Sequence, residues 1–275
     1  MKRKWKITLS ILTVLILGLA WFAYTPVDLR PAYIGDTIPE KDYVKGEALM
    51  AEMQAAYGGK DNWLAQKTGR FVQVADWYDD KFGLSGWDET PQQLQMRCVL
   101  GTDDSELTLL NGSNTGKTWG MDNWKHYQKA ADGTKNFQAK KQFERKMIFK
   151  NYWFQFPFRI GEAPIIAYAG ESTVEGKTYD LLYATWGSVA PNREYDQYIL
   201  YLDKETRHIE WLHFTIREVF NFMNSTANFT DFRKVNGILT PFNQYVVRGT
   251  PEKVGAKFHE NRYQWIEFGE VRVER

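Results

Sequence analysis

Residues 112–118, GSNTGKT, come nearest to a known chemical motif in this sequence. They resemble a phosphate-binding loop, in which backbone N–H groups and a lysine hold the phosphates of a nucleotide. However, three residues separate Gly112 from Gly116, where that loop has four. Trp119 and Gly120 also open no helix, whose N-terminus supplies part of such a site. The spacing therefore predicts a hairpin turn and no nucleotide chemistry.

Metal-binding and nucleophilic patterns are also missing from the sequence. The four histidines form no His-x-x-x-His or Glu-x-x-His pair; they are His126, His208, His213 and His259. His208 and His213 lie five residues apart, which on a strand directs them to opposite faces. No Gly-x-Ser-x-Gly nucleophile motif occurs, and the single cysteine, Cys98, excludes an internal disulfide and a multi-cysteine zinc site. We therefore expect no catalysis, no metal and no cofactor.

The charge balance argues against a nucleic-acid partner. The 275 residues include 35 Lys and Arg against 34 Asp and Glu. Residues 1–24 hold four of the bases and no acid, which leaves 31 bases against 34 acids in the remainder. Nucleic-acid binding generally needs a basic surface to engage phosphates. The composition stands out instead in its aromatic content of 16%, which favours half-buried sheets and apolar binding surfaces.

Residues 1–24 have the pattern of a membrane segment. A basic start precedes 18 uncharged residues, 7–24, which as a helix would be about 27 Å long and just span a bilayer core. Trp5 and Trp21 bracket this stretch as interfacial aromatics, and bulky rings stand where a signal cleavage site needs small residues. We expect an uncleaved, single-pass anchor in the inner (cytoplasmic) membrane, with the remainder on the periplasmic side. A cleaved signal, which would release the domain into the periplasm, is the alternative.

The elements after this segment follow from hydrophobic spacing. Residues 25–40, with three prolines, predict a linker, and residues 41–275 a single domain. A capping-box spacing at residues 37–40 starts a helix that we expect to end near Tyr57. Its apolar stripe consists of Val44, Ala48, Ala51 and Ala55, widened by Leu49 and Ala56.

From residue 69 onward the apolar period switches to two, which predicts strands. Leu94, Met96 and Cys98 alternate with polar residues, so we expect Cys98 to face a core. A helix is predicted within residues 133–150, followed by a strand meander in the C-terminal half. The fold class is therefore α+β, with one large curved antiparallel sheet, a half-open barrel, covered on one face by helices.

Several strands are apolar on both faces, although a sheet covered on one face needs only one apolar face. Tyr198 and Leu200 oppose Ile199 and Tyr201, for example. One explanation is a thick core with aromatic rings at its rim. The other is an apolar cavity inside the curved sheet, with residues 152–168 as its lid or mouth. The candidate lipid-binding residues lining this cavity are Trp77, Trp153, Phe154, Phe156, Phe158, Tyr168, Trp186, Tyr198, Trp211 and Phe214.

Three segments resemble the LolA-like superfamily of lipoprotein carriers, including the outer-membrane lipoprotein-sorting proteins. They are the helix 45–57 with GG and DNW after it, the hairpin YLDKETRHI at 201–209, and FTDFRKVNGILTPF at 229–242. The likeness extends over roughly residues 44–270. It implies a half-open antiparallel barrel, closed by helices, whose apolar interior holds acyl chains without catalysis. The chain departs from soluble carriers in its N-terminal anchor and its heavy aromatic region at 130–168.

These observations lead to a membrane-tethered envelope protein that binds a lipid or a lipoprotein acyl chain. Affinity would come from burying methylenes, at about 0.8 kcal/mol each. Two alternatives stay open: an envelope protein-interaction or sensing module with a vestigial cavity, and a lipid- or glycan-modifying enzyme. Both the lipid-binding hypothesis and the interaction-module hypothesis allow an envelope protein as a partner.

Overall fold

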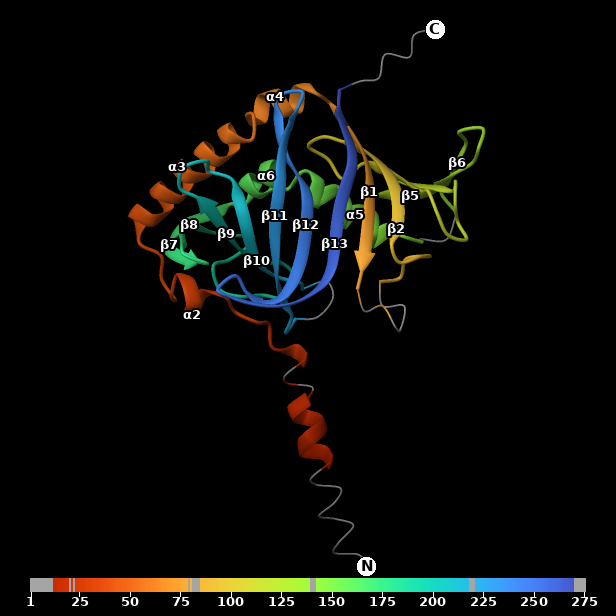
Figure 1. Cartoon of the computed structure of the whole chain (residues 1–275). Helices are drawn as coiled ribbons and strands as arrows, with labels where there is room; N and C mark the ends of the chain where they lie inside the picture. Colours follow the sequence, from red (N-terminus) through yellow and green to blue (C-terminus); the bar gives the residue numbers. More distant parts are fainter. Residues whose placement is uncertain are drawn as a thin grey trace, which may run out of the picture.

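The computed structural model describes residues 12–19, 21, 23–78, 80, 85–138, 142–217 and 221–269. Its main feature is a 13-stranded antiparallel sheet that curves around two short helices (Figure 1). The strand order is β6-β5-β4-β3-β2-β1-β13-β12-β11-β10-β9-β8-β7, so β6 and β7 are free edges and the sheet is not closed. The predicted α+β class with one large, open antiparallel sheet is confirmed.

The elements have the following bounds. The helices are α2 (Arg30–Tyr33), α3 (Glu40–Ala56), α4 (Lys60–Ala65), α5 (Glu144–Phe154), α6 (Phe156–Arg159) and the 3₁₀ turn η1 (Ile160–Glu162). The first strands are β1 (Thr68–Trp77), β2 (Gln92–Val99), β3 (Ser105–Leu109), β4 (Thr118–Asp122), β5 (Lys125–Lys129) and β6 (Lys135–Asn136). The later strands are β7 (Ile165–Val174), β8 (Lys177–Thr185), β9 (Gln197–Asp203), β10 (Ile209–Thr215), β11 (Asn224–Val235), β12 (Ile238–Thr250) and β13 (Lys253–Phe268).

Two hydrophobic clusters lie on opposite faces of the sheet. The larger cluster lies on the face toward α5 and α6, which we call the inner face; it includes Phe71 and Cys98, so the expected inward orientation of Cys98 is confirmed. The second cluster lies on the outer face of β8–β10 and includes Ile199, Tyr201 and Trp211. Strand β9, whose Tyr198 and Leu200 oppose Ile199 and Tyr201, is therefore covered on both faces.

The outer cluster is covered by residues 27–38, which we call the strap. These residues belong to the stretch predicted as a linker, yet Leu29 is 3% exposed and packs into the outer cluster. The Leu29 N–H donates to Gln197 Oε1 at 2.8 Å, and the Tyr33 hydroxyl lies 2.7 Å from His213 Nδ1. Buried Arg217 donates to the carbonyl of Val27. The strap is thus a packed layer of the domain and not a free connection.

Helix α3 docks on β7 through a face that the spacing of alanines did not predict. Its buried residues are Gly46, Leu49, Met50 and Met53, whereas Val44 is 62% exposed and Ala48, Ala51 and Ala55 are also exposed. The predicted stripe is therefore wrong except at Leu49, which is buried. A Cβ at Gly46 would lie 2.6 Å from the Cα of Ala167 in β7, so the missing side chain lets the helix approach the strand backbone closely.

Substituting Gly46 by alanine is expected to destabilise the protein by about 1–3 kcal/mol through overpacking, although alanine is the better helix former by about 1 kcal/mol. Denaturant unfolding of the wild-type chain and the variant measures this difference. Ala51→Gly, on the exposed face of the same helix, is the control and reports helix propensity alone. A Gly46→Ala variant that is more stable than the wild type would contradict the close docking of α3.

The region around residues 133–158 also differs from its prediction. The helix expected within 133–150 begins only at Glu144, and residues 135–136 form β6. Helix α5 then continues into the aromatic run that was expected to be a lid, up to Phe154. The reason is the aromatic spacing: Met147, Trp153 and Phe154 are all buried in one cluster, which requires a helical period through the run.

The predicted N-terminal anchor is only partly described. Residues 12–19, 21, 23 and 24 are helical and exposed, and they extend away from the domain (Figure 1). Residues 1–11, 20 and 22 of the predicted anchor lie outside the described part. Within the described ranges, no helix has both the length and the apolarity needed to cross a membrane.

Candidate functional site

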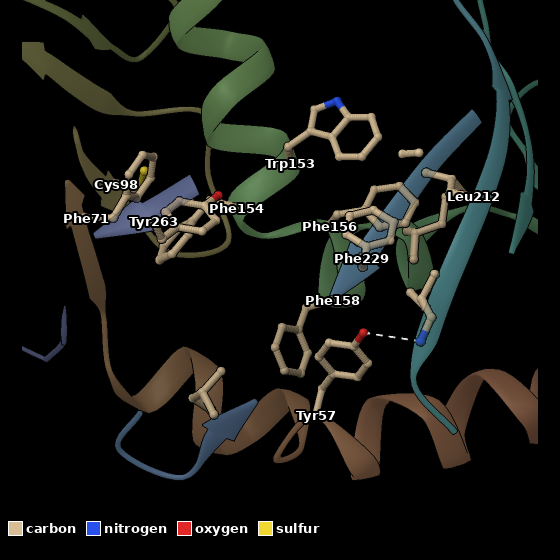
Figure 2. Close-up of a cluster of buried hydrophobic side chains, with 14 of the residues drawn as sticks. Tyr57, Phe71, Cys98, Trp153, Phe154, Phe156, Phe158, Leu212, Phe229 and Tyr263 are labelled. Carbon is tan, nitrogen blue, oxygen red and sulfur yellow. Dashed lines mark hydrogen bonds between the residues drawn. The ribbon is translucent and has the colours of Figure 1, made fainter. Parts of the chain in front are cut away.

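Four aromatic side chains from α5 and α6 occupy the inner face of the sheet. We call them the aromatic plug: Trp153, Phe154, Phe156 and Phe158. Figure 2 shows these side chains among the inner-face residues. All four are at most 8% exposed. The plug therefore fills the place where the sequence predicted a hollow.

Each ring of the plug contacts aromatic residues of a different part of the fold. Phe154 has its ring centre 4.8 Å from that of Phe71 in β1, and Phe158 stacks on Trp63 of α4 at 4.8 Å. Trp153 lies 5.2 Å from Phe214 of β10. Such ring pairs contribute about 0.5–1.5 kcal/mol each beyond the area that they bury. The plug thus connects both halves of the curved sheet.

Side-chain amides attach the plug to the turn between β2 and β3. Asn151 and Gln155 are fully buried, and both donate to the carbonyl of Thr102, at 2.9 and 3.2 Å. Gln155 also accepts from the Gly101 N–H at 2.8 Å and donates to Asn151 Oδ1 at 2.6 Å. We call this network the amide latch. It gives hydrogen-bond partners to buried polar groups. A buried polar group without a partner would cost about 1–3 kcal/mol of stability.

A small cavity lies between the plug and strands β10–β13. Its volume is about 20 Å³, and Tyr57, Phe229 and Gln244 are among its lining residues. A single water needs about 10–15 Å³ of such space, and small-molecule pockets generally have 300–1,000 Å³. The acyl-sized hollow expected from the sequence is therefore not open in this structure, because the rings of the plug occupy it.

The structure brings together five of the ten predicted lining residues. Trp153, Phe154, Phe156, Phe158 and Phe214 are buried in the inner cluster, and all but Phe214 line the cavity. Tyr198 and Trp186 lie beside them, partly buried, with ring centres 6.0 Å apart.

Of the remaining three predicted residues, Tyr168 is also partly buried against the inner cluster, and the other two lie elsewhere. Trp211 faces the outer cluster, so its assignment to an inner cavity is wrong; a register shift between Ile209 and Trp211 in β10 leaves Ile209 on the inner face. Trp77 stacks on His259 near the end of β1, and Tyr168 of β7 lies under the ammonium of Lys45 at 3.3 Å.

Sequence reasoning missed several residues that line the cavity. Tyr57 follows α3, and its hydroxyl accepts a hydrogen bond from the Ile209 N–H at 3.3 Å, shown as the dashed line in Figure 2. Burial raises the pKa of the Tyr57 hydroxyl. Phe229 and Gln244 come from β11 and β12. The alternation in residues 229–242 was the available signal for Phe229, but nothing local distinguishes a cavity wall from ordinary core.

Groups that could bind a metal do not gather in the described ranges: no three or more His, Cys, Asp or Glu side chains lie close enough together there. The predicted hairpin turn at 112–118 is found between β3 and β4, where Asp88 accepts from the Asn114 N–H at 2.8 Å. Cys98 is buried, and burial raises the pKa of its thiol. What the lining of the cavity offers chemically is mainly apolar contact.

The chain is similar in structure to three solved proteins at low sequence identity. One is a Vibrio parahaemolyticus domain provisionally described as an outer membrane lipoprotein-sorting protein domain, with a TM-score of 0.53, 9% identity, and coverage of 85% of this chain and 96% of that one. The others are a DUF1329 family protein from Desulfovibrio piger (TM-score 0.49, 12% identity, 84% and 95% covered) and a LolA superfamily protein from Nitrosomonas europaea (0.45, 9%, 80% and 94%).

No protein-family model and no curated protein matches the sequence. At these identities the structural likeness concerns the fold alone, and it rests on the Vibrio domain. The chain has a LolA-like fold, as the motifs in its sequence predicted.

Proposed function

We propose that this protein is a membrane-tethered envelope protein that binds a lipid, or the acyl chain of a lipoprotein, on the inner face of its sheet, without catalysis or a cofactor. The observation that carries the proposal is the aromatic plug. Its four rings cover the inner face of an open sheet, and short helices, not strands of the sheet, hold them there. An acyl chain would bind where the rings now lie.

Exchange of the rings for an acyl chain is energetically plausible. An aromatic side chain buries about 150–250 Å², and each methylene contributes about 0.8 kcal/mol on burial. An acyl chain that replaces the rings against Phe214, Phe229 and their neighbours restores most of the apolar contact that the sheet loses. The LolA-like fold supports this use of the inner face, since the Vibrio domain with this fold is described as a lipoprotein-sorting protein domain.

The proposed tether is the N-terminal segment. Its described part is a helix whose aliphatic side chains are all more than half exposed: Leu12, Val14, Leu15, Ile16, Leu17 and Leu19. Exposed aliphatic side chains in this number favour burial in another apolar medium, such as a bilayer. The tether would hold the domain at the periplasmic surface of the inner membrane.

Loosening the amide latch is the test of this function. In Gln155→Leu the Gly101 N–H and the Thr102 carbonyl each lose a hydrogen-bond partner. The conformation in which the plug lies on the sheet therefore loses about 1–3 kcal/mol of stability relative to one in which the plug has moved off it. We expect the full chain to take up a fluorescent fatty acid roughly tenfold faster than the wild type. Mass spectrometry of organic extracts from both purified proteins identifies any lipid they already carry.

The matched control is Gln95→Leu, an exposed glutamine on the outer face of β2, because it adds the same apolar group away from the plug. It should take up the probe at the wild-type rate. Probe that binds only to the N-terminal segment should likewise be taken up at the same rate by the wild type and both variants. No extractable lipid together with no uptake by wild type and Gln155→Leu would refute the proposal.

The filled inner face specifically favours one other function, a protein-interaction or sensing module. A cavity of about 20 Å³ is what a vestigial pocket would leave. In that case a partner crosslinked to the chain in intact membranes should persist when Phe156 is changed to alanine. Under lipid binding, by contrast, the same variant changes acyl-chain affinity.

A further inference from the structure

Lys150 on α5 is a buried lysine between the helix and the inner face of the sheet. It is 8% exposed, and its ammonium donates to Gln73 Oε1 of β1 at 2.5 Å and to Asn261 Oδ1 of β13. An isolated ammonium is costly to bury unless a counter-charge accompanies it. Two neutral amide oxygens solvate the charge but do not neutralise it.

The surroundings of Lys150 add positive charge and supply no counter-charge among the described residues. Among the described residues, no carboxylate lies within ion-pair distance of it. Lys146, one turn earlier on α5, approaches from the same helix, and the ring of Trp87 lies 5.9 Å away. Burial and the charge of Lys146 lower the pKa of Lys150 to about 7.

His259 of β13 completes the cluster. It is 8% exposed, and its Nδ1 has no hydrogen-bond partner in the described part of the chain. Trp77 stacks on the imidazole at 4.8 Å and covers one side of it. Burial, together with the charge of Lys150, lowers the pKa of His259 to about 3, so the ring is neutral at physiological pH and can donate one N–H.

This polar cluster is continuous with the apolar cavity. Asn261, which holds Lys150, is directly opposite Gln244 in the ladder between β12 and β13. Gln244 in turn lines the cavity with Trp153 and Phe229. The cavity therefore adjoins the ladder position of Asn261, whose side chain accepts from an ammonium that has no carboxylate partner among the described residues.

We propose that Lys150 and His259 form a head-group site for an amphiphile whose polar end is an oxyanion, as in a fatty acid or a lysophospholipid. One oxygen accepts from the Lys150 ammonium and another from the His259 N–H, while the acyl chain extends past Gln244 under the plug. The oxyanion supplies the missing negative charge. This proposal rests on the proposed function and specifies the ligand class.

The test compares three probes that share one acyl length: palmitate, hexadecanol and a palmitoyl lysophosphatidate, titrated into the full-length protein. At about pH 7 we expect at least roughly tenfold tighter binding of an anionic probe than of hexadecanol, the size of a charge-assisted hydrogen bond. Whether palmitate or lysophosphatidate binds more tightly identifies a carboxylate or a phosphate head. The preference should fall as the pH rises above about 7, because Lys150 then loses its proton.

Lys150→Met keeps the length of the side chain and removes the charge, so it should weaken the anionic probes to the level of hexadecanol and leave hexadecanol binding unchanged. Lys45→Met is the matched control; this exposed lysine of α3 should retain the preference. Equal binding of charged and neutral probes by the wild type, or a preference that survives in Lys150→Met, overturns the head-group site alone. Binding of none of the probes overturns the proposed function as well. The pH dependence in the wild type decides the question if Lys150→Met does not fold.

Discussion

Phe156→Ala is expected to lower the free energy of unfolding by about 3–5 kcal/mol and, at the same time, to raise the affinity for an acyl chain. Phe156 is 1% exposed and packs between Tyr152, Trp153 and Tyr198, with ring centres 5.7, 5.7 and 5.8 Å away. Removing its ring forfeits these contacts. The space it leaves adjoins the cavity of about 20 Å³ and enlarges it toward the size of an acyl segment.

Urea unfolding measures the first effect, and titration with palmitate measures the second. The matched control is Leu107→Ala, because Leu107 is fully buried in the same inner cluster but does not line the cavity. Leu107→Ala should also cost about 2–5 kcal/mol, with no gain in acyl-chain affinity. If both variants lose stability and neither binds palmitate more tightly, the space under the plug is ordinary core and the acyl-chain site is in the wrong place.

The free energy of unfolding should increase between about pH 7 and pH 9.5, with Lys150 as the main cause. Its pKa is about 7 in the folded chain against 10.5 in an unfolded one. Between these values the unfolded state binds more protons, so stability rises with pH by about 1.4 kcal/mol per unit, about 3 kcal/mol in all. Burial also lowers the pKa of Lys146, to about 8, which acts in the same direction.

Lys150→Met should flatten this profile, and the difference between the two proteins isolates the lysine. Several groups act in the opposite direction at the alkaline end, because burial raises the pKa of Cys98 and of the buried tyrosines, such as Tyr263. Those contributions are common to both proteins and cancel in the difference. His259, with its pKa lowered to about 3, affects stability only below about pH 6.5 and so lies outside the window. Parallel profiles for wild type and variant would show that Lys150 is not buried as described.

The order and type of the elements could largely be predicted from the sequence because they depend on local spacing. The period of two from residue 69 onward belongs to neighbouring residues, and it corresponds to strands in the structure. The inward orientation of Cys98 followed from the same alternation. The LolA-like fold was predicted from the resemblance of three short segments to that superfamily.

The candidate site could be predicted only in part. The aromatic run at 152–158 was identified as important, but a run of apolar residues does not tell whether it covers a hollow or fills it. That outcome depends on the amide latch, in which Gln155 meets Gly101 and Thr102, more than fifty residues away in the chain. The separation of Lys150 from Gln73 and Asn261 is larger still.

The sequence by itself determined a curved antiparallel sheet, the residues that alternate across it, and an excess of aromatic side chains on both of its faces. Only the tertiary structure decided what covers those faces: the plug on the inner one and the strap, with Leu29 and Tyr33, on the outer one. The physical reason is that burial of apolar surface is non-directional, so an apolar strand face specifies that it will be covered but not by which segment. The choice is made by polar contacts between residues far apart in the chain, which have no periodicity to read.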